Sequence, residues 1–182
     1  MTVGNSPDRG LIICYTGDGK GKTTAALGMC VRAAGYKMKV AVVQFIKGSW
    51  HYGEMDGIRL LEPYVEFQTA GKGFVGILDD KLPREAHIAA ARDALKIAEQ
   101  KLASDIYDIV ILDEIFVGVG LDLITARDIL NLIGQKPERT NLILTGRGAP
   151  SEVIDVADLV TEMTEIKHPF QKGIPARKGV DF

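Results

Sequence analysis

A glycine-rich segment near the N-terminus has the residue types and spacing of a phosphate-binding loop (P-loop). The segment Gly17-Asp18-Gly19-Lys20-Gly21-Lys22-Thr23 follows a short apolar run and precedes a run of helix-favouring residues. Closely spaced glycines let successive backbone N–H groups turn toward phosphate oxygens, and the N-terminus of a following helix also favours an anion. The pattern G-x-x-x-x-G-K-[ST] predicts that Lys22 contacts a phosphate oxygen and that the Thr23 hydroxyl coordinates Mg²⁺. We therefore predict a loop that holds the phosphates of ATP together with a divalent metal ion.

The loop departs from the general pattern at one position. Thr16 stands where the pattern has its first glycine, and the glycine comes one residue later, at Gly17, so the loop is tighter than usual. A strand-to-helix turn that binds nothing can also be rich in glycine. The position of this segment, after a buried strand and before a helix, favours phosphate binding over that alternative.

Two adjacent carboxylates are the second feature that can do chemistry. Asp113 and Glu114 directly follow the apolar run 109–112. Ligands of open α/β sheets bind at the C-terminal ends of the strands, where a carboxylate can reach a metal ion directly or through water. Asp113 as a simple helix N-cap is the alternative. The P-loop upstream favours the metal ion, and the sequence leaves open which of the two carboxylates coordinates it.

The sequence does not complete the machinery of phosphoryl transfer. A kinase needs a group that accepts the proton of its acceptor, and usually extra arginines over the transferred phosphoryl group. The sequence contains no second motif that indicates such a base or such arginines. A small-molecule kinase or NTPase is therefore an alternative with generic support, and an ATP-dependent regulatory or motor-type module is a third reading.

The elements that must position these residues alternate between strands and helices. We predict strands over 11–15, 40–45, 65–68, 109–112, 142–145 and 159–166, and helices over 22–34, 80–103, 126–133 and 151–157. Segment 46–76 outside its strand should be mostly loop, Ser151 should cap the last helix, and Ala26, Met29, Cys30 and Ala33 should form a buried stripe. Alternation at these lengths predicts a three-layer α/β fold with helices on both faces of a largely parallel sheet.

Composition sets limits on domains and partners. The chain has 182 residues, of which 46% are hydrophobic and 25% charged, with a formal net charge of −2. We expect one domain over 1–182 with a flexible segment 1–9, no nucleic acid as main partner, no membrane span, and a cytoplasmic location. Cys14 and Cys30 should be reduced core thiols, and the three histidines match no zinc spacing.

Taken together, the motifs resemble the P-loop type of ATP:corrinoid (cob(I)alamin) adenosyltransferases over nearly the whole chain. The matching blocks are the tight loop 17–24, Arg32, the segment 43–48, Leu112-Asp113-Glu114, Thr145-Gly146-Arg147-Gly148, His168-Pro169-Phe170, Gly173-Ile174 and Gly179-Val180-Asp181-Phe182. The block at 43–48 and the tail are not general P-loop features, so they make the match specific. The resemblance implies a P-loop (RecA-like) fold.

The resemblance also implies a reaction. A reduced Co(I) corrinoid attacks the ribose C5′ carbon of ATP, and inorganic triphosphate leaves intact. The cobalt is then the nucleophile, which explains why no catalytic base is visible, and the protein has to hold the triphosphate and aim C5′. Mg²⁺ as cofactor, a homodimer, and a reductant or flavoprotein that supplies Co(I) belong to the same expectation.

Site residues follow from the matching positions. ATP would be bound by Gly17, Asp18, Gly19, Lys20, Gly21, Lys22, Thr23, Thr24 and Arg147, with Lys22, Thr23 and Glu114 catalytic and Thr23, Asp113 and Glu114 at the metal ion. The corrinoid would be contacted by Arg32, Gln44, Lys47 and Phe74. Two departures concern the corrinoid: Gly76 stands where some relatives have a second aromatic residue, and the segment 116–120 is less polar than in relatives.

Overall fold

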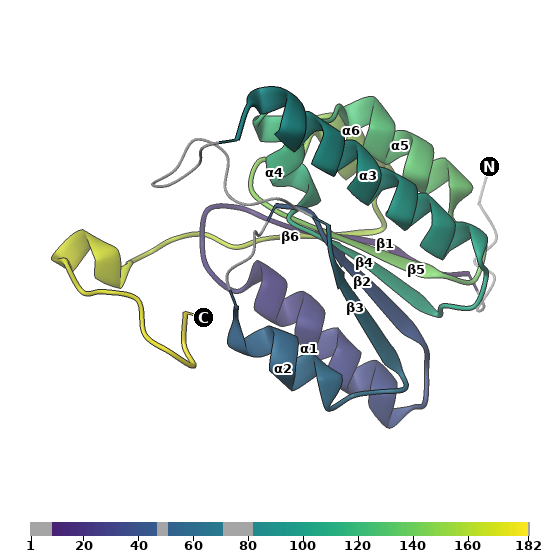
Figure 1. Cartoon of the computed structure of the whole chain (residues 1–182), viewed down its shortest axis with the longest axis horizontal. Helices are drawn as coiled ribbons and strands as arrows, with labels where there is room; N and C mark the ends of the chain where they lie inside the picture. Colours follow the sequence, from purple (N-terminus) through teal and green to yellow (C-terminus); the bar gives the residue numbers. More distant parts are fainter. Residues whose placement is uncertain (1–8, 47–50, 71–81, 182) are drawn as a thin grey trace.

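A parallel sheet of six strands forms the middle layer of the computed structural model, which describes residues 9–46, 51–70 and 82–181 (Figure 1). The strands are β1 (Ile12–Thr16), β2 (Val40–Gln44), β3 (Val65–Thr69), β4 (Ile109–Asp113), β5 (Asn141–Thr145) and β6 (Leu159–Glu162). Their order across the sheet is β3-β2-β4-β5-β1-β6, and each neighbouring pair is parallel. The predicted parallel α/β sheet is confirmed.

Helices cover both faces of this sheet, as predicted. Helices α1 (Lys22–Gly35) and α2 (Gly53–Arg59) lie on one face, and α3 (Arg84–Ala103), α4 (Ile115–Gly120), α5 (Ala126–Gln135) and α6 (Ser151–Val156) lie on the other (Figure 1). A short 3₁₀ helix, η1 (Pro169–Lys172), lies in the segment that follows β6. No helix in the described ranges is both long and apolar enough to cross a membrane.

The strands are apolar along their whole length because both faces of the sheet are covered. In β4, Ile109 and Ile111 pack with α1 on one face, whereas Val110 and Leu112 pack with α3 and α5 on the other. All four of these side chains are buried. The two cores therefore hold β4 rigidly, and the residue at its end, Asp113, has a fixed position.

Helix α1 shows the predicted buried stripe. Ala26, Cys30 and Ala33 are buried, and Met29 is half-buried against the same cluster. Cys14 and Cys30 are free thiols in the core, as predicted. Burial raises the pKa of Cys14 to about 11 and that of Cys30 to about 12, so both stay protonated and unreactive at neutral pH.

The structure differs from the local predictions at four places. The segment 46–76 contains α2, a helix that its two glycines disfavour but that buries Ile58 against the sheet. Helix α4 was not predicted, and it buries Phe116 and Ile115 completely. Ser151 does not cap α6, because Pro150 holds the cap position and the Ser151 hydroxyl donates to the Glu152 carboxylate.

The fourth difference concerns β6, which was predicted to continue to 166 but ends at Glu162. Its neighbour β1 ends at Thr16, which is paired with Glu162, so no strand remains to accept further ladder bonds. The next residue, Met163, donates to the Thr16 carbonyl oxygen at the end of β1 and accepts from the Gly19 N–H in the P-loop. The chain after β6 therefore starts next to the P-loop.

Candidate functional site

The P-loop lies between the C-terminal end of β1 and the first turn of α1. Gly17 has φ +93° and Gly21 has φ +112°, conformations that side-chain-bearing residues rarely adopt. The backbone of Met163 lies against the loop so closely that a Cβ on Gly17 would be 2.4 Å from the Met163 carbonyl oxygen. The glycine at 17 is therefore required both by its backbone conformation and by the chain that packs on it.

Lys22 lies beneath this loop. Its side chain is buried, and its Nζ donates to the carbonyl oxygens of Gly17 and Gly19, both at 2.6 Å. Burial lowers the pKa of Lys22, and the nearby Glu114 carboxylate opposes that shift. The result is a desolvated cation under a loop of backbone N–H groups, an arrangement suited to a phosphate oxygen.

Asp113 connects three elements at the end of the sheet. One of its carboxylate oxygens, Oδ1, accepts hydrogen bonds from the Thr23 hydroxyl at 2.9 Å and the Thr145 hydroxyl at 2.7 Å. The other oxygen, Oδ2, accepts from Gln44 Nε2 at 2.9 Å. Asp113 is 1% exposed, so these donors compensate a buried charge. They link β4 to α1, β5 and β2.

Glu114 has a different environment from Asp113. It has φ +61° and ψ 22°, which is left-handed backbone for a residue with a side chain, and its N–H donates to the Thr145 hydroxyl at 2.9 Å. Its side chain is only partly buried and acts electrostatically on Lys22. Strained backbone of this kind persists only where the surroundings enforce it, and it is common at active sites.

Two charged residues from distant parts of the chain, Arg147 and Asp181, contact the loop. Arg147 follows β5, is exposed, and donates to the Asp18 carbonyl oxygen at 3.4 Å, with its Nε 3.9 Å from the Asp18 carboxylate. Lys20 forms an ion pair with Asp181, far along the sequence. The structure thus places Arg147 beside the P-loop, and it adds Asp181, to which the sequence pattern assigned no role.

The predicted corrinoid residues are arranged differently from the ATP residues. Gln44 is fully buried inside the site and bonded to Asp113, and its Oε1 has no hydrogen-bond partner among the described residues. Arg32 lies in the last turn of α1, and a rise of about 1.5 Å per residue puts it about 15 Å along the axis from Lys22. Lys47, Phe74 and Gly76 lie outside the described residues.

The oxygen atoms beside the P-loop are of the kind that Mg²⁺ prefers as ligands. Thr23, Asp113 and Glu114 offer a hydroxyl and carboxylates, which are hard oxygen ligands. Within the described ranges, no group of three or more His, Cys, Asp or Glu residues forms a metal cage of its own. Mg²⁺ in nucleotide sites is usually bound by one or two protein oxygens together with substrate phosphates, and the residues here fit that mode.

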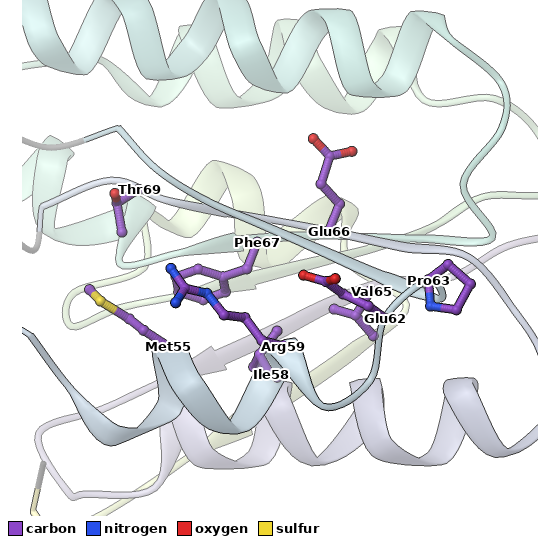
Figure 2. Close-up of a pocket in the computed structure, with 9 residues that line it drawn as sticks. All are labelled: Met55, Ile58, Arg59, Glu62, Pro63, Val65, Glu66, Phe67 and Thr69. Carbon is purple, nitrogen blue, oxygen red and sulfur yellow. The ribbon is translucent and has the colours of Figure 1, made fainter.

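A separate pocket lies at the β3 edge of the sheet, between α2 and β3 (Figure 2). It has a volume of about 420 Å³, and its lining includes Met55, Arg59, Phe67 and Thr69. Figure 2 shows Glu66 pointing away from it, toward the opposite face of the sheet, where its carboxylate binds Lys101 and Tyr107. No P-loop residue lines this pocket, so it is separate from the predicted phosphate site.

Comparison with solved structures supports the fold. Flagellar accessory protein FlaH from Methanocaldococcus jannaschii superposes with a TM-score of 0.54 at 13% identity, covering 85% of this chain and 71% of that chain. KaiC-like protein PH0186 from Pyrococcus horikoshii OT3 gives 0.51 at 15% identity, with 85% and 73% covered. At these identities the likeness concerns the fold alone, and it agrees with the predicted three-layer RecA-like arrangement.

Sequence comparison identifies the family. The family model described as ATP:corrinoid adenosyltransferase BtuR/CobO/CobP matches residues 8–182. Corrinoid adenosyltransferase of Escherichia coli K12 is 42% identical over 176 residues, which cover 96% of this chain and 87% of that protein. Corrinoid adenosyltransferase CobA of Salmonella typhimurium LT2 is 40% identical with the same coverage. With a P-loop, a buried lysine and a carboxylate at the strand end already in place, this match shows that the chain belongs to the ATP:corrinoid adenosyltransferase family.

Proposed function

We propose that the P-loop of this transferase binds the whole triphosphate of ATP while the 5′-deoxyadenosyl group passes to the Co(I) of a reduced corrinoid. The observation that supports the proposal is the convergence of Lys22, Thr23 and Asp113 at the N-terminus of α1. Each of these groups acts on phosphate or on its metal ion. The leaving group in this reaction is the entire triphosphate, so holding it is the main task of the protein.

Each residue has a distinct part in this proposal. Backbone N–H groups of the loop and the Lys22 ammonium bind phosphate oxygens, and the dipole of α1 adds to the attraction. Thr23 and the carboxylate end of β4 would hold Mg²⁺, which when bound neutralises charge on the leaving triphosphate. Arg147 and Lys20 add positive charge at the rim. The nucleophile comes with the corrinoid substrate.

The structure supports separate roles for the two adjacent carboxylates. Asp113 has three protein donors, one of them Thr23, so we propose that it orients the Thr23 hydroxyl and meets the metal ion through that residue or a water. Glu114 is more accessible and is the candidate for coordinating the metal directly or accepting from its waters. Glu114→Gln should lose activity while the fold survives; a normal rate and normal Mg²⁺ dependence would leave the metal to Asp113 alone.

We assign Gln44 a different role from the corrinoid contact that the resemblance implies. Because its side chain is fully buried and donates to Asp113, we propose that it holds Asp113 in place and does not touch the corrinoid. Arg32, Lys47 and Phe74 stay the residues proposed for the corrinoid, from the motif match. We also expect a cytoplasmic homodimer supplied with Co(I) by a reductant or flavoprotein, as the resemblance implies.

Product analysis of ATP tests the reaction. Incubation with ATP, Mg²⁺ and chemically reduced cobalamin should give adenosylcobalamin and inorganic triphosphate in equal amounts. ADP and phosphate as the products would contradict the proposal and favour a kinase or NTPase. Omission of the reductant is the matched control. Without Co(I), adenosylation should stop, and ATP should not be hydrolysed instead.

A further inference from the structure

The C-terminal tail, residues Met163–Asp181, is attached to the P-loop region at both of its ends. At its start, the Met163 N–H donates to the Thr16 carbonyl oxygen at 2.8 Å, and the Gly19 N–H donates to the Met163 carbonyl oxygen at 2.7 Å. At its end, Asp181 forms an ion pair with Lys20. Figure 1 shows the tail leaving the sheet after β6 and turning back through η1. Two contacts distant in sequence therefore join the tail to the same short loop.

The Asp181 carboxylate is fixed by its own turn. Its Oδ2 accepts from the Arg177 N–H at 2.7 Å, and the Asp181 N–H donates to the Arg177 carbonyl oxygen at 2.8 Å. The other oxygen, Oδ1, faces Lys20 Nζ. The Asp181 side chain is 17% exposed, whereas that of Lys20 is 48% exposed. The carboxylate is thus the fixed partner, and the long lysine side chain is the one it positions.

We propose that Asp181 is a positioning residue that holds the Lys20 ammonium at the P-loop for the triphosphate of ATP. The proposal rests on the proposed function, because it assumes that the loop binds triphosphate. A free lysine side chain loses considerable rotamer freedom when it binds a phosphate, and a preset orientation removes part of that cost. An ammonium has three protons, so the bond to Asp181 leaves two for phosphate oxygens.

The negative charge of Asp181 has an opposite effect that must be weighed. A carboxylate near the loop repels the triphosphate, but it is paired with Lys20 and lies partly in solvent, where the effective dielectric constant is high. The Lys20–Asp181 ion pair is screened as well, because Lys20 is 48% exposed, but its two groups are in direct contact, so screening weakens it less than it weakens the longer-range repulsion. We therefore expect the net effect of Asp181 on triphosphate binding to be favourable.

Binding of inorganic tripolyphosphate with Mg²⁺, followed by calorimetry, tests the proposal together with KM for ATP and kcat. Asp181→Asn should raise both the tripolyphosphate Kd and the KM about two- to fivefold and leave kcat nearly unchanged. Asp181→Glu should restore most of the affinity. Glu165→Gln is the matched control, because Glu165 lies in the same tail and contacts Gln171, so its loss of charge should change neither value.

The double variant separates positioning from a general effect of the tail. Lys20→Ala should weaken tripolyphosphate binding, and adding Asp181→Asn to it should weaken binding no further. Unchanged or tighter binding by Asp181→Asn alone, or a further loss in the double variant, would overturn the inference while leaving the proposed function intact. Failure of the unaltered protein to bind tripolyphosphate would instead overturn the proposed function, and this inference with it.

Discussion

Lysine ammonium groups hold both ends of β1, and the two lysines differ in what surrounds them. At the C-terminal end, Lys22 Nζ donates to two carbonyl oxygens of the P-loop. At the N-terminal end, Lys136 Nζ lies 2.9–3.3 Å from the carbonyl oxygens of Gly10, Pro137, Glu138 and Thr140. Burial lowers the pKa of both lysines. A desolvated lysine bound to carbonyl groups is therefore not by itself the sign of a binding site.

The difference lies in the remaining hydrogen-bonding capacity and in the neighbours. Lys136 has four acceptors for three protons, so its ammonium is saturated by the protein. Lys22 has two acceptors, which leaves a proton for a phosphate oxygen. It also lies beside a helix N-terminus and two carboxylates suited to Mg²⁺. The comparison predicts that Lys22 acts in function and Lys136 in stability.

The largest expected effect is on activity at Lys22. Lys22→Ala should lower kcat/KM for ATP about 100-fold or more, because it removes a buried charge that the triphosphate needs. Stability should change by less than about 1 kcal/mol, because relief of the desolvated charge offsets the loss of the two hydrogen bonds to the Gly17 and Gly19 carbonyl oxygens. Adenosylation rates and thermal melting check the two parts. A variant with less than a tenfold loss of activity would show that the loop N–H groups suffice without this lysine.

The matching change at the other end of β1 should have the opposite result. Lys136→Met keeps the length of the side chain and removes its donors, so the carbonyl oxygens of Gly10, beside β1, and Thr140, before β5, lose the Lys136 ammonium. The free energy of unfolding should fall by about 2–3 kcal/mol, and KM for ATP should change less than about twofold. Urea denaturation measures the first value and initial rates the second. Loss of activity without loss of stability would contradict the comparison.

The glycines at the two ends of β1 extend the test. A Cβ on Gly17 would be 2.4 Å from the Met163 carbonyl oxygen, and a Cβ on Gly10 would be 2.2 Å from that of Thr140. Gly17→Ala should weaken ATP binding about tenfold, whereas Gly10→Ala should lower stability by about 1–2 kcal/mol with ATP binding unchanged. Gly28→Ala in α1 is the control, because its Cβ would meet nothing within 4 Å and should stabilise the helix. Equal effects of the two clashing variants on ATP binding would refute the division of roles.

The parts of this fold that could be predicted are those with local patterns. The buried strand ending in Asp113 is a run of apolar residues, and the P-loop is a run of closely spaced glycines before a helix. Both patterns are complete within a few residues. Strand order, by contrast, depends on which distant segments pair, so the sequence pattern predicted the parallel sheet but not the order of its strands.

The parts that could not be predicted depend on distant partners. Asp113 binds Gln44, which is 69 positions away, and Thr145, which is 32 away, so no spacing in the sequence marks these contacts. Helix α4 contains two glycines and β-branched residues, which disfavour a helix, and it forms because Phe116 and Ile115 fill the core. The Lys136 cage consists of backbone carbonyls, which every residue carries, so it has no sequence signature.

The smallest expected effect concerns Asp158, next to the Lys136 end of β1. Its Oδ2 accepts from the Ile12 N–H at 2.8 Å, and its Oδ1 pairs with Arg9. Burial alone would raise the pKa of Asp158, but the Ile12 N–H and Arg9 outweigh burial and hold the pKa below its ordinary value. A carboxylate with a lowered pKa stabilises the fold above its unfolded pKa of about 3.9, and this contribution disappears as the pH falls through the folded value.

Asp158→Asn should therefore cost less than about 1 kcal/mol at pH 7, with the difference from the unaltered protein shrinking below about pH 4. Urea denaturation at the two pH values measures it, and adenosylation should be unaffected. If the loss of unfolding free energy in Asp158→Asn instead increased toward acid pH, the Ile12 N–H and Arg9 would not be stabilising the ionised Asp158 carboxylate. Asp113, at the opposite end of the sheet, provides the contrast: it too accepts buried hydrogen bonds, but one of its donors is Thr23, so Asp113→Asn should impair turnover where Asp158→Asn does not.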